Sequence, residues 1–153
     1  MNKVLFWDFD GTLSYPNRCF SNCLSQALSR YGYAIPENKI AAFMADFYSW
    51  KTPEIIYPER THALWWDAHF EKVKDFCSEN AVDKAKAQDI CHALREILID
   101  ITNYKLYEDT VSTLEACRRL GYKNYLITNN YPEISDILKK LGIASYFALV
   151  KKK

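Results

Sequence analysis

Hydrophobic residues follow two different patterns along this chain of 153 residues. Near the N-terminus, a short unbroken run of apolar residues extends from Val4 to Trp7. Such a run is typical of a strand that is buried on both faces of a parallel sheet, and it predicts a strand near residues 3–8. Long stretches downstream instead carry apolar residues three and four positions apart, which is the spacing of amphipathic helices.

Four helices are expected in the stretch that follows this strand. The first ends at Gly32 and the second begins near Pro36, because glycine favours helix ends and proline favours helix starts. A third is expected over residues 61–78, after a loop over 50–60, and a fourth begins near Asp83. The apolar positions of the first, second and fourth helices are Phe20, Leu24, Ala27, Leu28 and Tyr31; Ile40, Phe43, Met44 and Phe47; and Ile90, Leu94, Ile97 and Ile101.

From Leu106 onward the pattern alternates between helix and strand. We expect one helix that Asp109 caps and Gly121 ends, and another that Pro132 opens and Gly142 closes. Strands are expected over residues 124–128 and 147–150. The apolar residues of the two helices are Val111, Leu114 and Leu120 in the first and Ile134, Ile137, Leu138 and Leu141 in the second.

The predicted order of elements is therefore one strand, four helices, and then two helix–strand pairs. This order fits an α/β fold in which a Rossmann-like parallel sheet is interrupted by an all-helical insert. We expect the sheet and its helices over residues 1–14 and 106–153, and the insert over residues 15–105.

Two acidic residues stand where the first predicted strand ends. Asp8 and Asp10 are one residue apart, at the carboxyl edge of a sheet, where open α/β folds hold their ligands. Alternate strand residues point to opposite faces, so both acids can serve one site only if a loop begins after Asp8, and Gly11 allows that turn. Two carboxylates this close imply a hard cation such as Mg²⁺. The alternative is a simple turn that closes a strand.

Composition excludes several classes of protein. The 20 basic and 19 acidic residues are balanced, whereas a nucleic-acid-binding protein should be markedly basic. The sequence shows no apolar run long enough to span a membrane and no signal-peptide pattern, so we expect a cytoplasmic protein without membrane or nucleic-acid partners. We expect the five cysteines to be free and mostly buried, and the three scattered histidines to lie on helix surfaces or caps: Cys19, Cys23, Cys77, Cys91 and Cys117; His62, His69 and His92.

Residues 5–13 read Leu-Phe-Trp-Asp-Phe-Asp-Gly-Thr-Leu, and this stretch resembles motif I (hhhDxDGT) of the haloacid dehalogenase superfamily, whose members are mostly phosphatases. The second motif of that superfamily is an apolar strand that ends in Thr or Ser, and Tyr125-Leu126-Ile127-Thr128-Asn129 resembles it. The resemblance implies a phosphoglycolate phosphatase-like branch, in which the helical insert is a C1-type cap.

The resemblance also assigns roles to residues. Asp8 would attack phosphorus and carry an aspartyl-phosphate, while Asp10 would protonate the leaving oxygen and then activate water. Mg²⁺ would be held by the Asp8 carboxylate and the Asp10 main-chain carbonyl. Gly11, Thr128 and Asn129 would bind the substrate phosphate through their amides and the Thr128 hydroxyl. Dehalogenases that resemble this motif lack an acid at the position of Asp10, so Asp10 favours phosphoryl transfer.

The sequence departs from the superfamily pattern after the second motif. A motif III lysine in a G-x-x-K-P-like segment and the acidic cluster of motif IV are both missing, and we interpret Lys151–Lys153 as a solvated tail. We therefore expect an incomplete core in which Val4–Trp7 lies at an open sheet edge with an uncovered apolar face. Such an edge favours self-association or a covering partner.

The expected function is a Mg²⁺-dependent, phosphatase-like hydrolase that acts on a small phosphorylated metabolite. An alternative is a catalytically impaired binding or regulatory module that keeps the fold, and haloacid dehalogenase activity is a third, disfavoured one. We interpret Arg18 and Arg60 as solvated, although either could reach a substrate anion from the insert. The aromatic residues of the insert are interpreted as its core rather than as substrate contacts: Tyr48, Trp50, Tyr57, Trp65, Trp66 and Phe70.

Overall fold

The computed structural model describes residues 3–15, 20–47 and 64–148. The chain divides into two units, and its boundaries fall after Asn17 and after Ile99, close to the expected positions 14/15 and 105/106. We call them the α/β unit, with described residues 3–15 and 100–148, and the helical unit, with described residues 20–47 and 64–99. Within these described ranges, no helix is long and apolar enough to cross a membrane.

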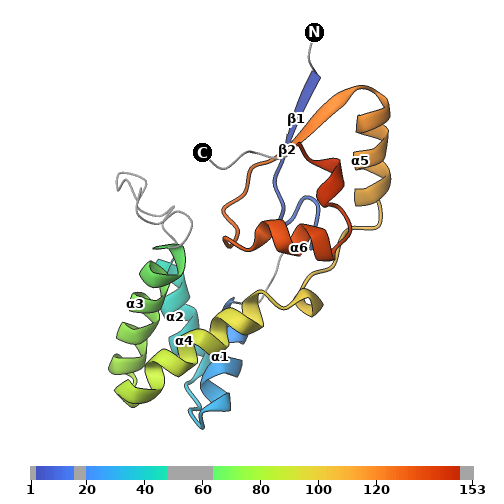
Figure 1. The fold of residues 1–153 in the computed structure, drawn as a ribbon. Coiled ribbons are helices and arrows are strands. Elements are labelled where there is room, and N and C mark those ends of the chain that lie inside the picture. The colour runs from blue at the N-terminus through green and yellow to red at the C-terminus, as the bar shows by residue number, and fades with distance from the viewer. Residues whose placement is uncertain (1–2, 16–19, 48–63, 149–153) are drawn as a thin grey trace. The chain divides into compact units, whose positions relative to one another are not determined.

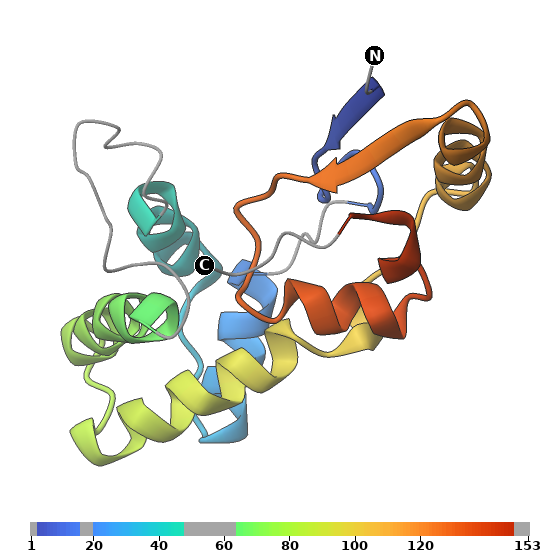
Figure 2. The ribbon, with the colours of Figure 1, turned by 45° about the horizontal axis from the view of Figure 1, so that its top comes forward.

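Two parallel strands form the sheet of the α/β unit. β1 (Lys3–Trp7) pairs with β2 (Tyr122–Leu126) in a register that places Lys3 opposite Tyr122 and Trp7 opposite Leu126. The two strands lie side by side in both ribbon views (Figures 1 and 2). The parallel α/β architecture confirms the predicted fold class. The second strand lies two residues earlier than the predicted 124–128, because pairing with β1 begins at Tyr122 and ends at Leu126.

One face of this sheet is covered. Trp7 on β1 and Leu126 on β2 pack against a hydrophobic cluster that includes Leu114 of α5 (Thr110–Arg119) and Ile137 of α6 (Ile134–Lys140). The remaining buried members of this cluster are Phe9, Leu13, Tyr104, Leu138 and Ile143.

The opposite face of β1 is exposed. Val4 is 39% exposed and Phe6 is 66% exposed, and the Phe6 ring touches only its cross-strand neighbour Tyr125 among described aromatic rings, at 5.7 Å between centroids. The unbroken apolar run is typical of a strand buried on both faces, yet one face of β1 is uncovered among the described residues, as was expected for this chain. The apolar run is long enough for such a strand, but the described residues cover one side of it.

Asn124 links three segments of the α/β unit. Its Oδ1 accepts a hydrogen bond from Trp7 Nε1 at 3.0 Å, and its Nδ2 donates to the Tyr146 carbonyl at 3.3 Å. Its main-chain carbonyl accepts from Ala148 N at 2.8 Å. The strand expected over 147–150 is reduced, in its described part, to a single bridge from Phe147 to Asn124. The 3-10 helix η4 (Ala144–Tyr146) comes directly before it. Residues 149 and 150 lie outside the described residues.

The two helices of this unit begin and end close to the predicted residues. Asp109 occupies the N-cap position of α5 without a side-chain capping bond, and α6 begins at Ile134, after Pro132 and the N-cap Glu133. Leu114 is buried, but Val111 and Leu120 are 42% and 66% exposed. The exposure of Leu120 follows from its position, about 120° around the helix from the buried Leu114 at 3.6 residues per turn.

The helical unit contains α1 (Phe20–Arg30), α2 (Glu37–Phe47), α3 (Leu64–Glu79) and α4 (Lys84–Leu98). α4 packs against α1 and α3, and α1 packs against α2. Its buried apolar side chains are Phe20, Cys23, Leu24, Ala27, Leu28, Ile40, Met44, Phe47, Trp66, Phe70, Val73, Phe76, Cys77, Val82, Ala87, Ile90, Cys91, Ala93, Leu94, Ile97 and Leu98.

The predicted apolar stripes of the helical unit are largely confirmed, with two exceptions. Tyr31 follows the end of α1 and is 37% exposed. Ile101 lies beyond α4, in the 3-10 helix η3 (Ile101–Asn103) of the α/β unit, where it packs against the hydrophobic cluster. The expected loop over 50–60 and the first residues of the third predicted helix, 61–63, lie outside the described residues.

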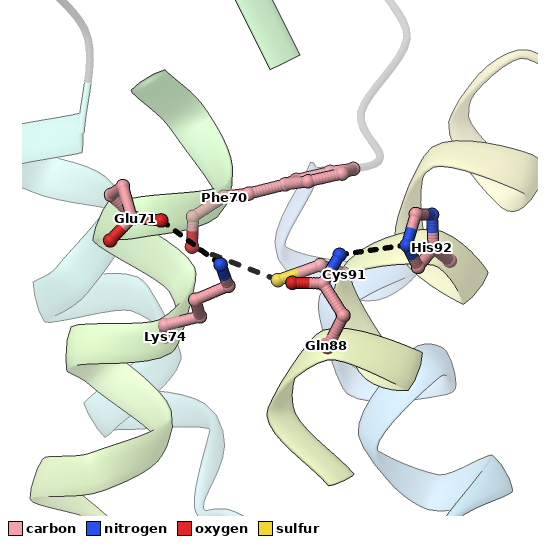
Figure 3. A network of polar contacts seen from close by, with 6 residues as sticks. All are labelled: Phe70, Glu71, Lys74, Gln88, Cys91 and His92. Atoms are coloured by element: carbon pink, nitrogen blue, oxygen red, sulfur yellow. Dashed lines mark hydrogen bonds and ion pairs between the residues drawn. The ribbon is translucent and has the colours of Figure 1, made fainter. Parts of the chain in front are cut away.

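Polar contacts bridge or flank the interface between α3 and α4 (Figure 3). Cys91 Sγ on α4 donates to the Phe70 carbonyl on α3 at 3.7 Å. Lys74 and Glu71 form an exposed pair at 2.9 Å on α3, and this hydrogen bond raises the pKa of Lys74. Gln88 Nε2 lies 2.7 Å from His92 Nε2 on α4.

The thiols of the helical unit are structural. Burial raises the pKa of Cys77 to about 11 and that of Cys91 to about 12, so both remain neutral thiols at physiological pH and are poor nucleophiles. Cys23 is also a buried thiol that forms no disulfide, which confirms the prediction for these three residues, whereas Cys117 of α5 is half-buried. Cys19 lies outside the described residues.

The aromatic residues of the helical unit that the structure describes belong to its core. Trp66 and Phe70 are 5% and 6% exposed. Trp65 is half-buried and stacks on the half-buried His69 at 3.7 Å between ring centroids, and His92 is exposed on α4. Three of the aromatic residues expected in the core and one of the three histidines lie outside the described residues: Tyr48, Trp50 and Tyr57, and His62.

Candidate active site

The two acids of the candidate site, Asp8 and Asp10, lie on either side of the buried Phe9. β1 ends at Trp7, and the Phe9 side chain then enters the hydrophobic cluster, where it is 0% exposed and lies 6.0 Å from the Tyr104 ring between centroids. Asp8 and Asp10, on either side of Phe9, are both exposed. The predicted transition from strand to loop at Asp8 is confirmed, and it places both carboxylates at the carboxyl end of β1.

Main-chain hydrogen bonds close the loop that carries these acids. The Phe9 carbonyl accepts from the amides of Leu13 at 2.9 Å and Ser14 at 3.0 Å, and Gly11 N donates to the Ser14 carbonyl at 2.7 Å. Gly11 has a φ of +79°, a conformation that costs roughly 1–2 kcal/mol for a residue with a Cβ. Glycine at this position therefore allows the turn, as expected from the sequence.

The α/β unit also holds this loop from α5. Thr110, at the start of α5, is buried and its Oγ1 donates to the Leu13 carbonyl at 2.7 Å. Tyr107 N donates to the same carbonyl at 3.2 Å. Because a carbonyl has two lone pairs, both bonds can be made together, and they tie the acid-bearing loop to the segment that precedes α5.

The loop after β2 leaves from the same edge of the sheet. Ile127 N donates to the Trp7 carbonyl at 2.8 Å, so pairing continues one residue beyond β2. Thr128 follows in the loop and is half-buried, and Asn129 is exposed. The expectation that Thr128 ends the strand itself was wrong by two residues, since the strand ends at Leu126.

A side-chain hydrogen bond joins the two loops. Asn130 Nδ2 donates to Asp10 Oδ2 at 2.8 Å, although the two residues are 120 positions apart in the chain. Sequence reasoning missed Asn130, to which it assigned no role. Within the described residues, no hydrogen bond joins Thr128 or Asn129 to either acid.

The donor chemistry of the site suits a hard cation. Asp8 Oδ1 accepts from Phe9 N at 2.7 Å, which leaves Asp8 Oδ2 available to a ligand. Among the described residues, no group of three His, Cys, Asp or Glu side chains forms a metal cluster. Mg²⁺ commonly binds through one or two carboxylates together with water and substrate phosphate, so Asp8 and Asp10 fit this ion without a third acid. Arg18, Arg60 and Lys151–Lys153 lie outside the described residues.

Solved structures share this fold. A predicted phosphoglycolate phosphatase from Haemophilus somnus has a TM-score of 0.57 at 21% identity, over 96% of this chain and 60% of that protein. A candidate beta-phosphoglucomutase from Thermotoga maritima has a TM-score of 0.66 at 18% identity, over 100% of this chain and 64% of that protein. A hydrolase from Deinococcus radiodurans, solved with bound phosphate and sodium, has a TM-score of 0.54 at 15% identity, over 96% and 56%.

The chain thus spans less than two thirds of the length of each of these three proteins. No curated protein matches it significantly. A family model described as haloacid dehalogenase-like hydrolase matches residues 2–152, which includes the loop of Asp8 and Asp10 and the loop of Thr128. On this evidence the chain belongs to the haloacid dehalogenase-like hydrolases.

Proposed function

We propose that this chain is a Mg²⁺-dependent phosphatase-like hydrolase that acts on a small phosphorylated metabolite through an aspartyl-phosphate. The observation that carries the proposal is the hydrogen bond from Asn130 to Asp10 at 2.8 Å. It brings the loop of the two acids against the loop that contains Thr128 and Asn129. A nucleophile, a proton donor and phosphate-binding groups then belong to one edge of the sheet.

Asp8 has the features of the nucleophile. It is exposed, and the bond from Phe9 N to Oδ1 orients the carboxylate, so that Oδ2 can attack phosphorus. An oxygen–phosphorus bond to Asp8 forms as the bond to the leaving alkoxide breaks. Asp10 supplies the proton that the alkoxide takes, and then accepts a proton from the water that hydrolyses the aspartyl-phosphate and releases inorganic phosphate.

Donors around the acids would bind the phosphate oxygens. The Thr128 hydroxyl, the Asn129 amide and the main chain at Gly11 are the groups that we assign to this task. When bound by Asp8 and the Asp10 main-chain carbonyl, Mg²⁺ would neutralise negative charge between nucleophile and phosphate. The bound phosphate of the related Deinococcus radiodurans hydrolase supports phosphate as the ligand class. We further propose that the helical unit is the cap that selects the substrate.

Phosphate release from a panel of small phosphate esters tests this function, with Mg²⁺ and with excess chelator. Asp8→Asn should abolish turnover, because an amide is a poor nucleophile. Asp10→Asn should slow alkyl phosphates on the order of 10²–10⁴-fold and nitrophenyl phosphate much less, because nitrophenolate needs little protonation. Hydroxylamine-sensitive labelling of Asp8 by a radioactive phosphoryl donor would report the covalent step directly.

The second candidate is a binding or regulatory module with the same fold. With two acids and no third acidic ligand among the described residues, the site would hold Mg²⁺ weakly, and weak metal binding favours this candidate. The module would bind phosphate without turnover. Equal phosphate release by the parent chain and Asp8→Asn would refute the enzymatic proposal, and calorimetric binding of phosphate by both proteins would then support the module.

A further inference from the structure

We infer that Asn130 is a positioning residue for Asp10: its side-chain amide donates a hydrogen bond to one carboxyl oxygen and so orients the carboxyl group for proton transfer. The inference rests on the proposed function, because Asp10 is assigned there as proton donor and acceptor. It deepens that function by naming the residue from the second loop on which the orientation of Asp10 depends.

Neighbouring contacts determine which way the Asn130 amide points. Tyr131 N donates to Asn130 Oδ1 at 2.7 Å, so the oxygen end of the amide faces its own main chain. The nitrogen end therefore faces Asp10 Oδ2, at 2.8 Å. Tyr131 packs against the hydrophobic cluster of the α/β unit, which anchors the main chain that orients the amide.

This contact engages one carboxyl oxygen of Asp10. Oδ2 accepts an N–H from Asn130 at 2.8 Å, and a proton placed on Oδ2 would compete with that donor for the same oxygen. The bond also restricts rotation of the carboxyl, and a proton donor that is already oriented loses less freedom when the reaction begins.

Two variants separate this role from a general effect on folding. Asn130→Ala removes both hydrogen bonds, while Asn130→Asp keeps the shape and the acceptor for Tyr131 N but replaces the donor with a carboxylate. Asn38→Asp, at an exposed position of α2, adds the same charge at a residue that belongs to neither loop of the site and is the matched control. All three should retain the parent circular dichroism spectrum.

The expected result is a dependence on the leaving group. For an alkyl phosphate, kcat should fall roughly 10–100-fold in both Asn130 variants, a fraction of the full general-acid contribution. For nitrophenyl phosphate it should fall less than about 3-fold, because little protonation is needed. Asn130→Asp should also raise KM for both esters by repelling phosphate. Asn38→Asp should match the parent chain in every parameter.

A spectroscopic measurement tests the contact between Asn130 and Asp10 independently of turnover. The side-chain NH₂ signals of Asn130, assigned by their loss in Asn130→Asp, should shift toward the values of a solvated amide in Asp10→Ala. If turnover occurs and both esters lose kcat equally, the inference is wrong while the proposed function stands. If turnover occurs but the Asn130 signals are unchanged in Asp10→Ala, the inference is also wrong. If neither the parent nor any variant turns over, the proposed function fails, and the inference that rests on it fails too.

Discussion

Replacing Asn124 with alanine removes the polar link between β1, β2 and η4. Asn124 is 2% exposed, and its side chain makes one bond to Trp7 Nε1 at 3.0 Å and one to the Tyr146 carbonyl at 3.3 Å. Alanine cannot replace either bond. The indole N–H of Trp7 and the carbonyl of Tyr146 would both lose their partner in a partly buried environment.

The structure supports a loss of about 2–4 kcal/mol in the free energy of unfolding. Each of the two hydrogen bonds contributes ~1 kcal/mol, and leaving a buried partner unsatisfied costs ~1–3 kcal/mol. The lower half of that range applies to Trp7, because its side chain is half-buried and water can reach part of it. Asn124→Leu fills the volume without restoring either bond, so it should recover less than half of the loss.

Amide hydrogen exchange measures this loss within the α/β unit. The Ile127 amide, which donates to the Trp7 carbonyl at 2.8 Å, reports on the junction of β1 and β2. Its protection should fall by an amount equivalent to ~2–4 kcal/mol in Asn124→Ala. A double-mutant cycle with Trp7→Phe, which removes the indole donor, should give a coupling free energy near ~1 kcal/mol.

Two results would refute this reasoning. A coupling free energy below ~0.3 kcal/mol lies within ordinary additivity and would show that the indole bond contributes nothing. Full recovery of stability in Asn124→Leu would show that the cavity, not the hydrogen bonds, causes the loss. Asn38→Ala is the control, since an exposed substitution should stay within about 0.5 kcal/mol of the parent.

Four further predictions concern other parts of the chain. Ala81 follows α3 with a φ of +58°, so Ala81→Gly should raise the free energy of unfolding by ~0.5–1 kcal/mol in urea denaturation, and a decrease would contradict the strain. Because burial raises the pKa of Cys77 to about 11 and of Cys91 to about 12 from 9.0, peptide mapping should find both alkylated more slowly at pH 8 than the half-buried Cys117. Between these pKa values only the thiols of the unfolded chain ionise. The free energy of unfolding should therefore keep its full value below pH 9 and fall as the pH rises from 9 toward 11. Phe6 is 66% exposed, so sedimentation velocity should detect concentration-dependent pairing of two copies that Phe6→Lys abolishes, and identical profiles would exclude this face.

Local patterns in the sequence were sufficient for the helices and for the first loop. The stripe at Ile90, Leu94 and Ile97 describes a buried helix face, and α4 begins after Asp83, whose side chain accepts from Ala85 N at 2.9 Å. The loop after Asp8 could be predicted because the glycine requirement is local: only the residue at position 11 has to adopt a positive φ.

Strand ends were harder, because pairing determines them. The apolar run Tyr125–Ile127 suggested a strand that reaches Thr128, yet β2 begins at Tyr122 opposite Lys3 and ends at Leu126 opposite Trp7. A strand ends where its partner stops offering hydrogen bonds. β1 ends at Trp7, and no property of residues 122–128 alone carries that information. Asn130 was missed for the same reason, since its contact with Asp10 follows from the register between two segments that are distant in the chain.

The exposure of the Asp8 and Asp10 side chains depends on the apolar residue between them. Phe9 is fully buried in the hydrophobic cluster, and its carbonyl accepts the amides of Leu13 and Ser14. With Phe9 held in this way, Asp8 and Asp10 are excluded from the core and both face solvent at the end of β1. A polar residue in place of Phe9 would therefore disturb the site through the core, with no change in either carboxylate. The spacing of one residue between the acids matters because it accommodates this anchor.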